Sequence, residues 1–80
     1  MRMDDMRQVV ATNLRKLRHA KGLSQEALAF ESGVDRSYIS QLETGVYSAS
    51  VTMLGKLAAA LDVEPGRLLQ PARPNAKKRS

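Results

Sequence analysis

The sequence has 80 residues, no cysteine and a formal net charge of +5 at pH 7. This length allows one small domain but no separate catalytic or ligand-sensing domain, and the lack of cysteine excludes disulfide bonds and thiolate metal sites. The longest wholly apolar run, residues 57–61, is far too short to cross a membrane, and the first ten residues do not resemble an export signal, so a cytoplasmic protein is expected.

The first predicted helix covers residues 4–20. Apolar residues recur at spacings of four, four and three between Met6 and Leu17, which places them along one side of a helix. Gly22 is expected to end this helix in a left-handed conformation.

Charge is distributed unevenly along the chain. Residues 1–70 carry 9 basic and 8 acidic side chains, so this part is nearly neutral. Residues 6–25 nevertheless contain five basic side chains and no acidic one, which indicates either a surface for an anionic partner or a solvated helix face. The five are Arg7, Arg15, Lys16, Arg18 and Lys21.

The second predicted helix covers residues 25–32. Ser24 precedes it as an N-cap, Phe30 counts among its apolar residues, and Gly33 breaks it. The third helix follows within three residues and runs from Arg36 to about residue 44. Asp35 is expected to cap it by accepting a backbone N–H bond.

The fourth and fifth predicted helices complete the chain. Ser50 is the expected cap of the fourth, whose apolar face begins at Val51, and Pro65 occupies the first turn of a short fifth helix. No segment shows strand alternation, so the sequence predicts an all-α, compact five-helix bundle over residues 1–70. Residues 71–80 are expected to form a basic, disordered tail that is either solvated or in contact with phosphate.

The third predicted helix has two contrasting sides. Ile39 and Leu42 fall on one side at helical spacing. The other side carries hydroxyl, amide and guanidinium groups, which hydrogen-bond well to base edges, although a neutral solvated face is the alternative. Its members are Arg36, Ser37, Ser40, Gln41 and Thr44.

The stretch from residue 25 to residue 44 resembles the helix-turn-helix of the Cro and phage-repressor (XRE-type) family of bacterial regulators. The resemblance lies in Ala29, in Gly33 four positions later, and in Ile39 and Leu42 six and nine positions after that glycine. The segments NLRKLRHAKGLSQEALA and SVTMLGKLAAALDVEPGRLL resemble the remaining helices of that fold. The resemblance implies a lambda-repressor-like DNA-binding domain.

The resemblance also implies roles for single residues. The third helix would enter the major groove of double-stranded DNA, and an arginine–glutamate pair matching Arg18 and Glu43 would join it to the first helix. Base reading is expected from Arg36, Ser37, Ser40 and Gln41. Phosphate contacts are expected from Arg18, Lys21, Ser24, Gln25, Tyr38, Thr44, Tyr47 and Ser48. The loop VYSA departs from the family, because it lacks the usual lysine and arginine and offers only the hydroxyls of Tyr47 and Ser48.

The predicted function is a sequence-specific transcriptional regulator, either a repressor or an operon controller. One recognition helix reads only a few base pairs, so a homodimer on a near-palindromic operator is expected. A phage-type repressor, a restriction-modification controller and an antitoxin that represses its own operon stay open. The expected dimer patch consists of Met53, Leu61, Leu68 and Leu69.

Two other classes of function are a protein-binding module and an enzyme. A protein-binding module, such as an antitoxin that blocks a toxin through the fifth helix and the tail, is the alternative. An enzyme is not expected, because one histidine and no paired carboxylates give no converging catalytic groups. No cofactor, metal, membrane or small-molecule substrate is implied.

Overall fold

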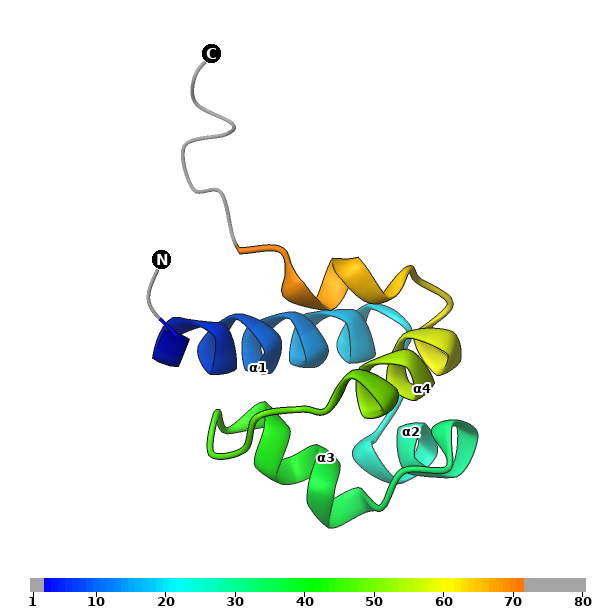
Figure 1. Ribbon diagram of the computed structural model, residues 1–80. Helices are drawn as coiled ribbons and strands as arrows, with labels where there is room; N and C mark the ends of the chain where they lie inside the picture. Colours follow the sequence, from blue (N-terminus) through cyan, green and yellow to red (C-terminus); the bar gives the residue numbers. More distant parts are fainter. Residues whose placement is uncertain (1–2, 72–80) are drawn as a thin grey trace.

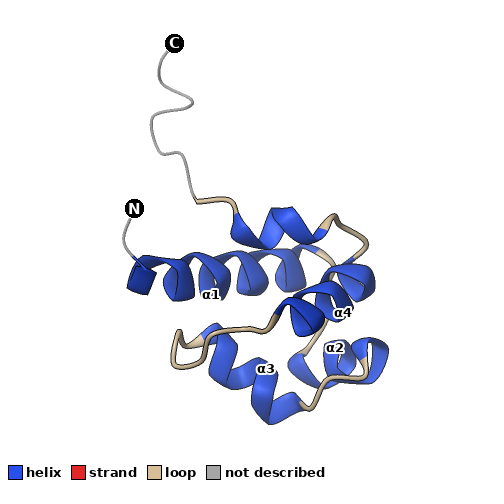
Figure 2. Cartoon of the chain, viewed as in Figure 1, coloured by secondary structure: helices blue, strands red, loops and turns tan. Residues whose placement is uncertain are grey.

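The computed structural model describes residues 3–71, which form four α-helices followed by one short 3-10 helix (Figure 1). No β-strand occurs in this part of the chain, so the all-helical prediction is confirmed (Figure 2). The predicted tail beyond residue 71 lies outside the described residues. The elements are α1 (Met3–Ala20), α2 (Gln25–Ser32), α3 (Arg36–Glu43), α4 (Val51–Leu61) and η1 (Pro65–Leu69).

The predicted short fifth helix is present as η1, but it is a 3-10 helix of five residues, so only four of the five helices are α-helices. Its N–H groups bond three residues back, from Arg67 to the carbonyl of Glu64 and from Gln70 to that of Arg67. Pro65 lacks an N–H group and Gly66 is a poor helix former, so too few residues remain for an α-helical turn to propagate.

Side-chain caps begin two of the α-helices as predicted. The Ser24 hydroxyl accepts the N–H of Ala27 at 2.9 Å at the start of α2. The Ser50 hydroxyl accepts the N–H of Met53 at 3.1 Å at the start of α4. Each cap satisfies a backbone donor that has no partner within its own helix.

The start of α3 differs from the prediction, because Asp35 makes no side-chain cap bond. Its carboxylate instead accepts a hydrogen bond from the hydroxyl of Ser37. The preceding turn forms as expected: Gly33 has φ +73° and donates its N–H to the carbonyl of Ala29. This left-handed residue lets α3 follow α2 after three residues.

The core receives side chains from every helix. Helix α1 lies between α3 on one side and η1 on the other, while α2 packs against α3 and α4 (Figure 1). These contacts hold α3 on two sides and leave its remaining side exposed. The largest fully buried side chains are Leu14, Leu28, Ile39, Leu42, Leu57 and Leu68.

Two apolar residues lie outside the core: Phe30, counted among the apolar residues of the second predicted helix, and Val51, expected on the apolar face of the fourth. Phe30 is 89% exposed and Val51 is 85% exposed. Phe30 follows Leu28 by two residues, which places it on the far side of α2 from the core. Val51 is the first residue of α4, and the buried part of that helix begins only one turn later, at Leu54.

Candidate nucleic-acid interface

Helix α3 buries its apolar side and exposes its polar side. Ile39 and Leu42 have no exposed surface, whereas Arg36, Ser37 and Gln41 are exposed and Ser40 is half-buried. The helical repeat of 3.6 residues separates the two sets. The only carboxylate of α3 belongs to Glu43, which is buried, so the exposed side of this helix carries hydroxyl, amide and guanidinium groups without an acid.

Arg18 of α1 holds Glu43 at the end of α3, as the family resemblance implies. Its Nε and Nη2 donate to the two carboxylate oxygens at 2.6 and 2.9 Å, and its Nη1 donates to the carbonyl of Leu23 at 2.8 Å. Arg18 and Glu43 are 8% and 5% exposed. A charge-assisted contact through two hydrogen bonds, shielded from solvent in this way, fixes the orientation of the two helices.

The surroundings of Glu43 keep it ionised. Burial alone raises the pKa of its carboxyl, but hydrogen bonds from Arg18 and Gln25 and the charges of Arg18 and Arg15 outweigh burial, so the pKa of Glu43 is lowered. The hydrogen bond to Glu43 in turn raises the pKa of Arg18. The pair therefore stays charged at neutral pH.

Arg15 also contacts Glu43, which the sequence interpretation missed. Its Nη1 donates to the backbone carbonyl of Glu43 at 2.7 Å. The sequence spacing could have indicated this contact, because Arg15 lies three residues before Arg18 and therefore on the same side of α1.

The predicted phosphate-binding residues before α3 have different surroundings. The donors of Arg18 point inward to Glu43 and Leu23, which leaves Arg18 little surface for a DNA contact. Gln25 is half-buried and donates to Glu43 at 3.1 Å. Ser24 is exposed but serves as the cap of α2. Lys21 is exposed and takes part in neither of the ion pairs found among the described residues.

Arg36 leans from the start of α3 toward α2. Its Nε lies 3.8 Å from a carboxylate oxygen of Glu26, and its Nη1 lies 3.5 Å from the amide oxygen of Gln25. The side chains of Arg36 and Glu26 are 50% and 76% exposed, so this ion pair is weak. Arg36 can therefore turn toward a ligand at small cost.

The segment after α3 contributes hydroxyl groups beside the polar side. Thr44 is exposed, and its hydroxyl donates to the carbonyl of Gln41 at 2.8 Å. The rings of Tyr38 and Tyr47 are 5.6 Å apart and tilted by 52°. Tyr38 is half-buried against the core, whereas Tyr47 and Ser48 are exposed. These contacts place the loop against α3.

The expected dimer patch is only partly at the surface. Leu61 and Leu68 are 2% and 0% exposed, because they fill the space between α4, η1 and the rest of the core. They are therefore corrected to core residues. Met53 is half-buried and Leu69 is 40% exposed, and Leu69 borders a mainly apolar hollow of about 210 Å³ beside α1 and α4.

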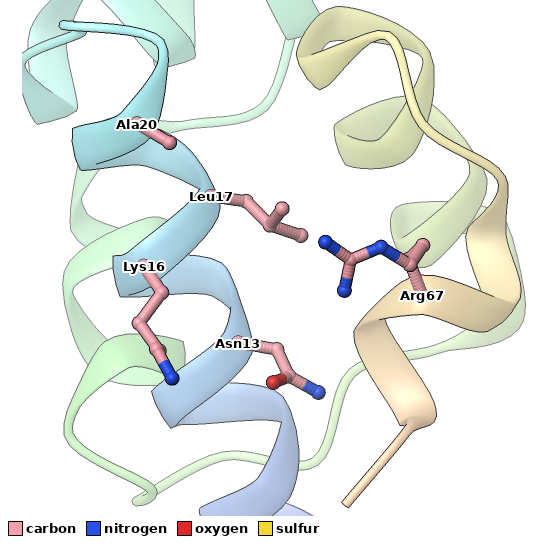
Figure 3. A pocket seen from close by; sticks show the side chains of 5 residues that line it. All are labelled: Asn13, Lys16, Leu17, Ala20 and Arg67. Carbon is pink, nitrogen blue, oxygen red and sulfur yellow. The ribbon is translucent and has the colours of Figure 1, made fainter. Parts of the chain in front are cut away.

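A second pocket, of about 270 Å³, lies at the surface between α1 and η1 (Figure 3). Arg67 extends from η1 toward Leu17 and Asn13 of α1, and Lys16 lies at the rim. The Asn13 amide donates to the carbonyls of Leu68 and Gln70 at 3.0 and 2.8 Å, which ties η1 to α1. No acid lines this pocket, so it lacks a carboxylate for acid–base chemistry.

The described residues contain no group of three or more histidine, cysteine or acidic residues that could hold a metal ion. Within the same part of the chain, none of the helices combines the length and apolar character needed to cross a membrane.

Comparisons with known proteins agree with this geometry. The chain is 41% identical over 73 residues to a hypothetical transcription factor of Neisseria meningitidis, covering 91% of this chain and 69% of that protein. The crystal structure of that Neisseria factor matches with a TM-score of 0.83 at 40% identity, over 91% of this chain and 84% of the other.

A control protein and a restriction-modification controller protein are also similar. The control protein C.BamHI of Bacillus amyloliquefaciens is 37% identical over 67 residues, which cover 82% of this chain and 83% of that protein. The crystal structure of the controller protein C.AhdI from Aeromonas hydrophila matches with a TM-score of 0.72 and 53% identity, over 75% of this chain and 91% of the other. The model of the Helix-turn-helix family HTH_3 matches residues 14–68. The chain therefore belongs to the HTH_3 helix-turn-helix family.

Proposed function

We propose that the protein is a sequence-specific transcriptional regulator that places α3 in the major groove of double-stranded DNA. The observation that carries this proposal is that α3 buries one side fully and exposes hydroxyl, amide and guanidinium groups on the other, where none of its own residues is acidic. The side chains that would read bases are Arg36, Ser37, Ser40 and Gln41. Arginine pairs with guanine and glutamine with adenine, each through two hydrogen bonds, and serine hydroxyls bond to several base edges.

Phosphate contacts would flank this helix on both sides. Lys21 offers an exposed charge before α2, and the N-terminus of α2 adds backbone N–H groups near Gln25. After α3, the exposed hydroxyls of Thr44, Tyr47 and Ser48 can donate to phosphate. Such contacts would fix the position of α3 on the duplex without selecting a sequence.

A homodimer would supply the information that one short helix lacks. Two copies related by a two-fold axis place their recognition helices roughly 34 Å apart, which matches half-sites one turn apart on a near-palindromic operator. The surface around Leu69 and Met53 is the proposed contact between the copies. Similarity to the control protein C.BamHI and to the restriction-modification controller protein C.AhdI supports a repressor or operon controller, which we expect to act in the cytoplasm.

Selection of bound duplexes from a random pool tests this proposal directly. We expect enrichment of one near-palindromic sequence, which should then outcompete a scrambled duplex of equal length in a band-shift assay. Equal competition by the scrambled duplex, with no enriched sequence, would show that α3 reads no bases. The lack of any shift at low salt would exclude DNA as the partner.

A further inference from the structure

Helix α3 lacks the features that usually stabilise a short helix. It has eight residues, no acidic residue in its first turn and no basic residue in its last turn. Arg36 places a positive charge in its first turn, and the carboxylate of the N-cap residue Asp35 accepts no backbone N–H bond. The C-terminal end has no favourable charge of its own, and an isolated helix of this length is unstable in water. The position of α3 must depend on contacts from other elements.

A positively charged side chain of α1, Arg15, lies at the C-terminal end of α3. The carbonyl of Gln41 accepts the N–H of Val46, and the carbonyl of Leu42 accepts that of Gly45. The carbonyl of Glu43, the last residue of the helix, accepts Nη1 of Arg15 at 2.7 Å. A cation donating to a terminal carbonyl is the favourable arrangement at a helix C-terminus.

Two arginines one turn apart on α1 thus hold two different parts of one residue. Arg18 binds the buried carboxylate of Glu43, while Arg15 binds the backbone carbonyl of the same residue. The contact from Arg15 acts on the main chain at the end of α3 and therefore adds a second restraint on the tilt and rotation of this helix. Base reading depends on that restraint, since a small displacement spoils two-point hydrogen bonds.

We infer that Arg15 is a positioning residue that sets the orientation of α3 and thereby raises discrimination between operator and other DNA. This inference rests on the proposed function, because discrimination is measured on DNA. Arg15 would act through the Glu43 carbonyl rather than by contact with bases or phosphate. Its removal should therefore weaken operator binding more than binding to unrelated duplexes.

The neighbouring residue provides a matched control. Arg15→Gln and Lys16→Gln each remove one positive charge from exposed, adjacent positions of α1. Lys16, however, lines the pocket on the η1 side (Figure 3), whereas Arg15 contacts α3. The two variants therefore have the same net charge and differ in the contact to Glu43.

The experiment measures the Kd of the wild type and of both variants for the selected operator and for a scrambled duplex. We expect Lys16→Gln to weaken both complexes by the same factor. Arg15→Gln should weaken the scrambled complex to the same extent and the operator complex by about a further five- to tenfold, the scale of one impaired base contact. Amide hydrogen exchange at Gly45 and Val46 should be faster in Arg15→Gln without DNA.

Two outcomes would overturn the inference. Equal operator and scrambled losses in Arg15→Gln would show that the contact to Glu43 does not affect base reading, and a shallower salt dependence than in Lys16→Gln would then identify Arg15 as a phosphate contact. Unchanged exchange at Gly45 and Val46 would show that the contact does not restrain the end of α3.

The test remains informative if a variant or the DNA assay fails. Arg15→Met keeps a long aliphatic stem and good helix propensity, and it replaces Arg15→Gln if thermal unfolding shows that the latter is not folded. A wild-type protein that binds no duplex contradicts the proposed function, whereas the exchange measurement still tests the contact between α1 and α3.

Discussion

Arg18 and Glu43, 25 residues apart in sequence, are joined by two hydrogen bonds between a guanidinium and a carboxylate that are both buried. Gln25 of α2 donates to the same carboxylate. A single acidic side chain thus connects the three helices that carry the proposed DNA-binding surface. Stability and recognition are therefore linked through Glu43.

The first prediction concerns pH. The pKa of Glu43 is lowered from its ordinary value of 4.5, so its contribution to folding is complete above about pH 4.5 and is lost as the pH falls through the lower, folded value. Glu43→Gln should reduce the free energy of unfolding at neutral pH by ~1–3 kcal/mol. It should also reduce the loss of stability in acid.

Urea unfolding of the wild type and of Glu43→Gln between neutral pH and about pH 3 checks this prediction. Glu31→Gln is the control, because Glu31 is an exposed acid that forms no ion pair among the described residues. Parallel pH profiles for the wild type and Glu43→Gln would contradict the proposed origin of the acid sensitivity.

The sequence predicted the elements best where local signals agree. Ser24 and Ser50 were identifiable as caps, and Gly33 as the turn between α2 and α3, because capping and positive φ depend on residues next to one another in the chain. The apolar spacing of α3 fixed which side is buried, since Ile39 and Leu42 leave its hydroxyl and amide groups outward. The polar side of the candidate site was predictable for the same reason.

The second prediction tests base reading by Gln41. Its exposed amide makes no side-chain hydrogen bond among those found in the described residues, so Gln41→Ala should leave the fold unchanged. Binding to the operator should weaken by ~1–3 kcal/mol, with relaxed preference at one base position, because one two-point contact is lost. Repeating the random-pool selection with the variant measures the preference at each position.

A uniform loss on operator and scrambled DNA would contradict the reading role of Gln41. Gln70→Ala is a suitable control, because Gln70 is also exposed but follows η1, on the opposite side of α1 from α3 (Figure 1). This control should bind like the wild type.

The third prediction tests whether Lys21 contacts the phosphate backbone of DNA. Lys21→Gln should lower affinity for all duplexes and reduce the slope of log Kd against log salt by about 1. Lys56→Gln on α4 provides the charge-matched control, because Lys56 is exposed on a helix that packs on α2 and η1. Equal salt slopes for the two variants would place Lys21 away from the DNA backbone.

Tertiary contacts decided what the sequence could not reveal. The missing cap at Asp35 has a local cause instead, because its carboxylate accepts from the hydroxyl of Ser37, only two residues away. Leu68 and Leu69 are adjacent and alike, and only the docking of η1 on α1 decides that Leu68 is buried while Leu69 stays partly exposed. The role of Arg15 depends on the end of a helix 28 residues away. Short-range patterns carry no information about such pairings.

The fourth prediction concerns the loop before α4. Ser50→Ala should lower the free energy of unfolding by about 1 kcal/mol, because the N–H of Met53 loses its side-chain partner. Ser48→Ala, two residues earlier in the same loop, should change stability by less than about 0.5 kcal/mol, since Ser48 is exposed and caps no helix. Equal thermal unfolding midpoints for the two variants would show that the cap contributes nothing measurable.

The fifth prediction tests the proposed dimer surface through Leu69, which is 40% exposed next to a mainly apolar hollow. Leu69→Glu should shift the protein from dimer to monomer, because a charge is costly to desolvate at a mainly apolar contact. Phe30→Glu is the matched control: it places the same charge at an exposed apolar residue on α2, far along the chain from η1. Sedimentation equilibrium on each protein measures the dissociation constant. A Leu69→Glu protein that remains dimeric while Phe30→Glu is monomeric would move the interface to α2, and half-site spacing would then have to be derived from that surface.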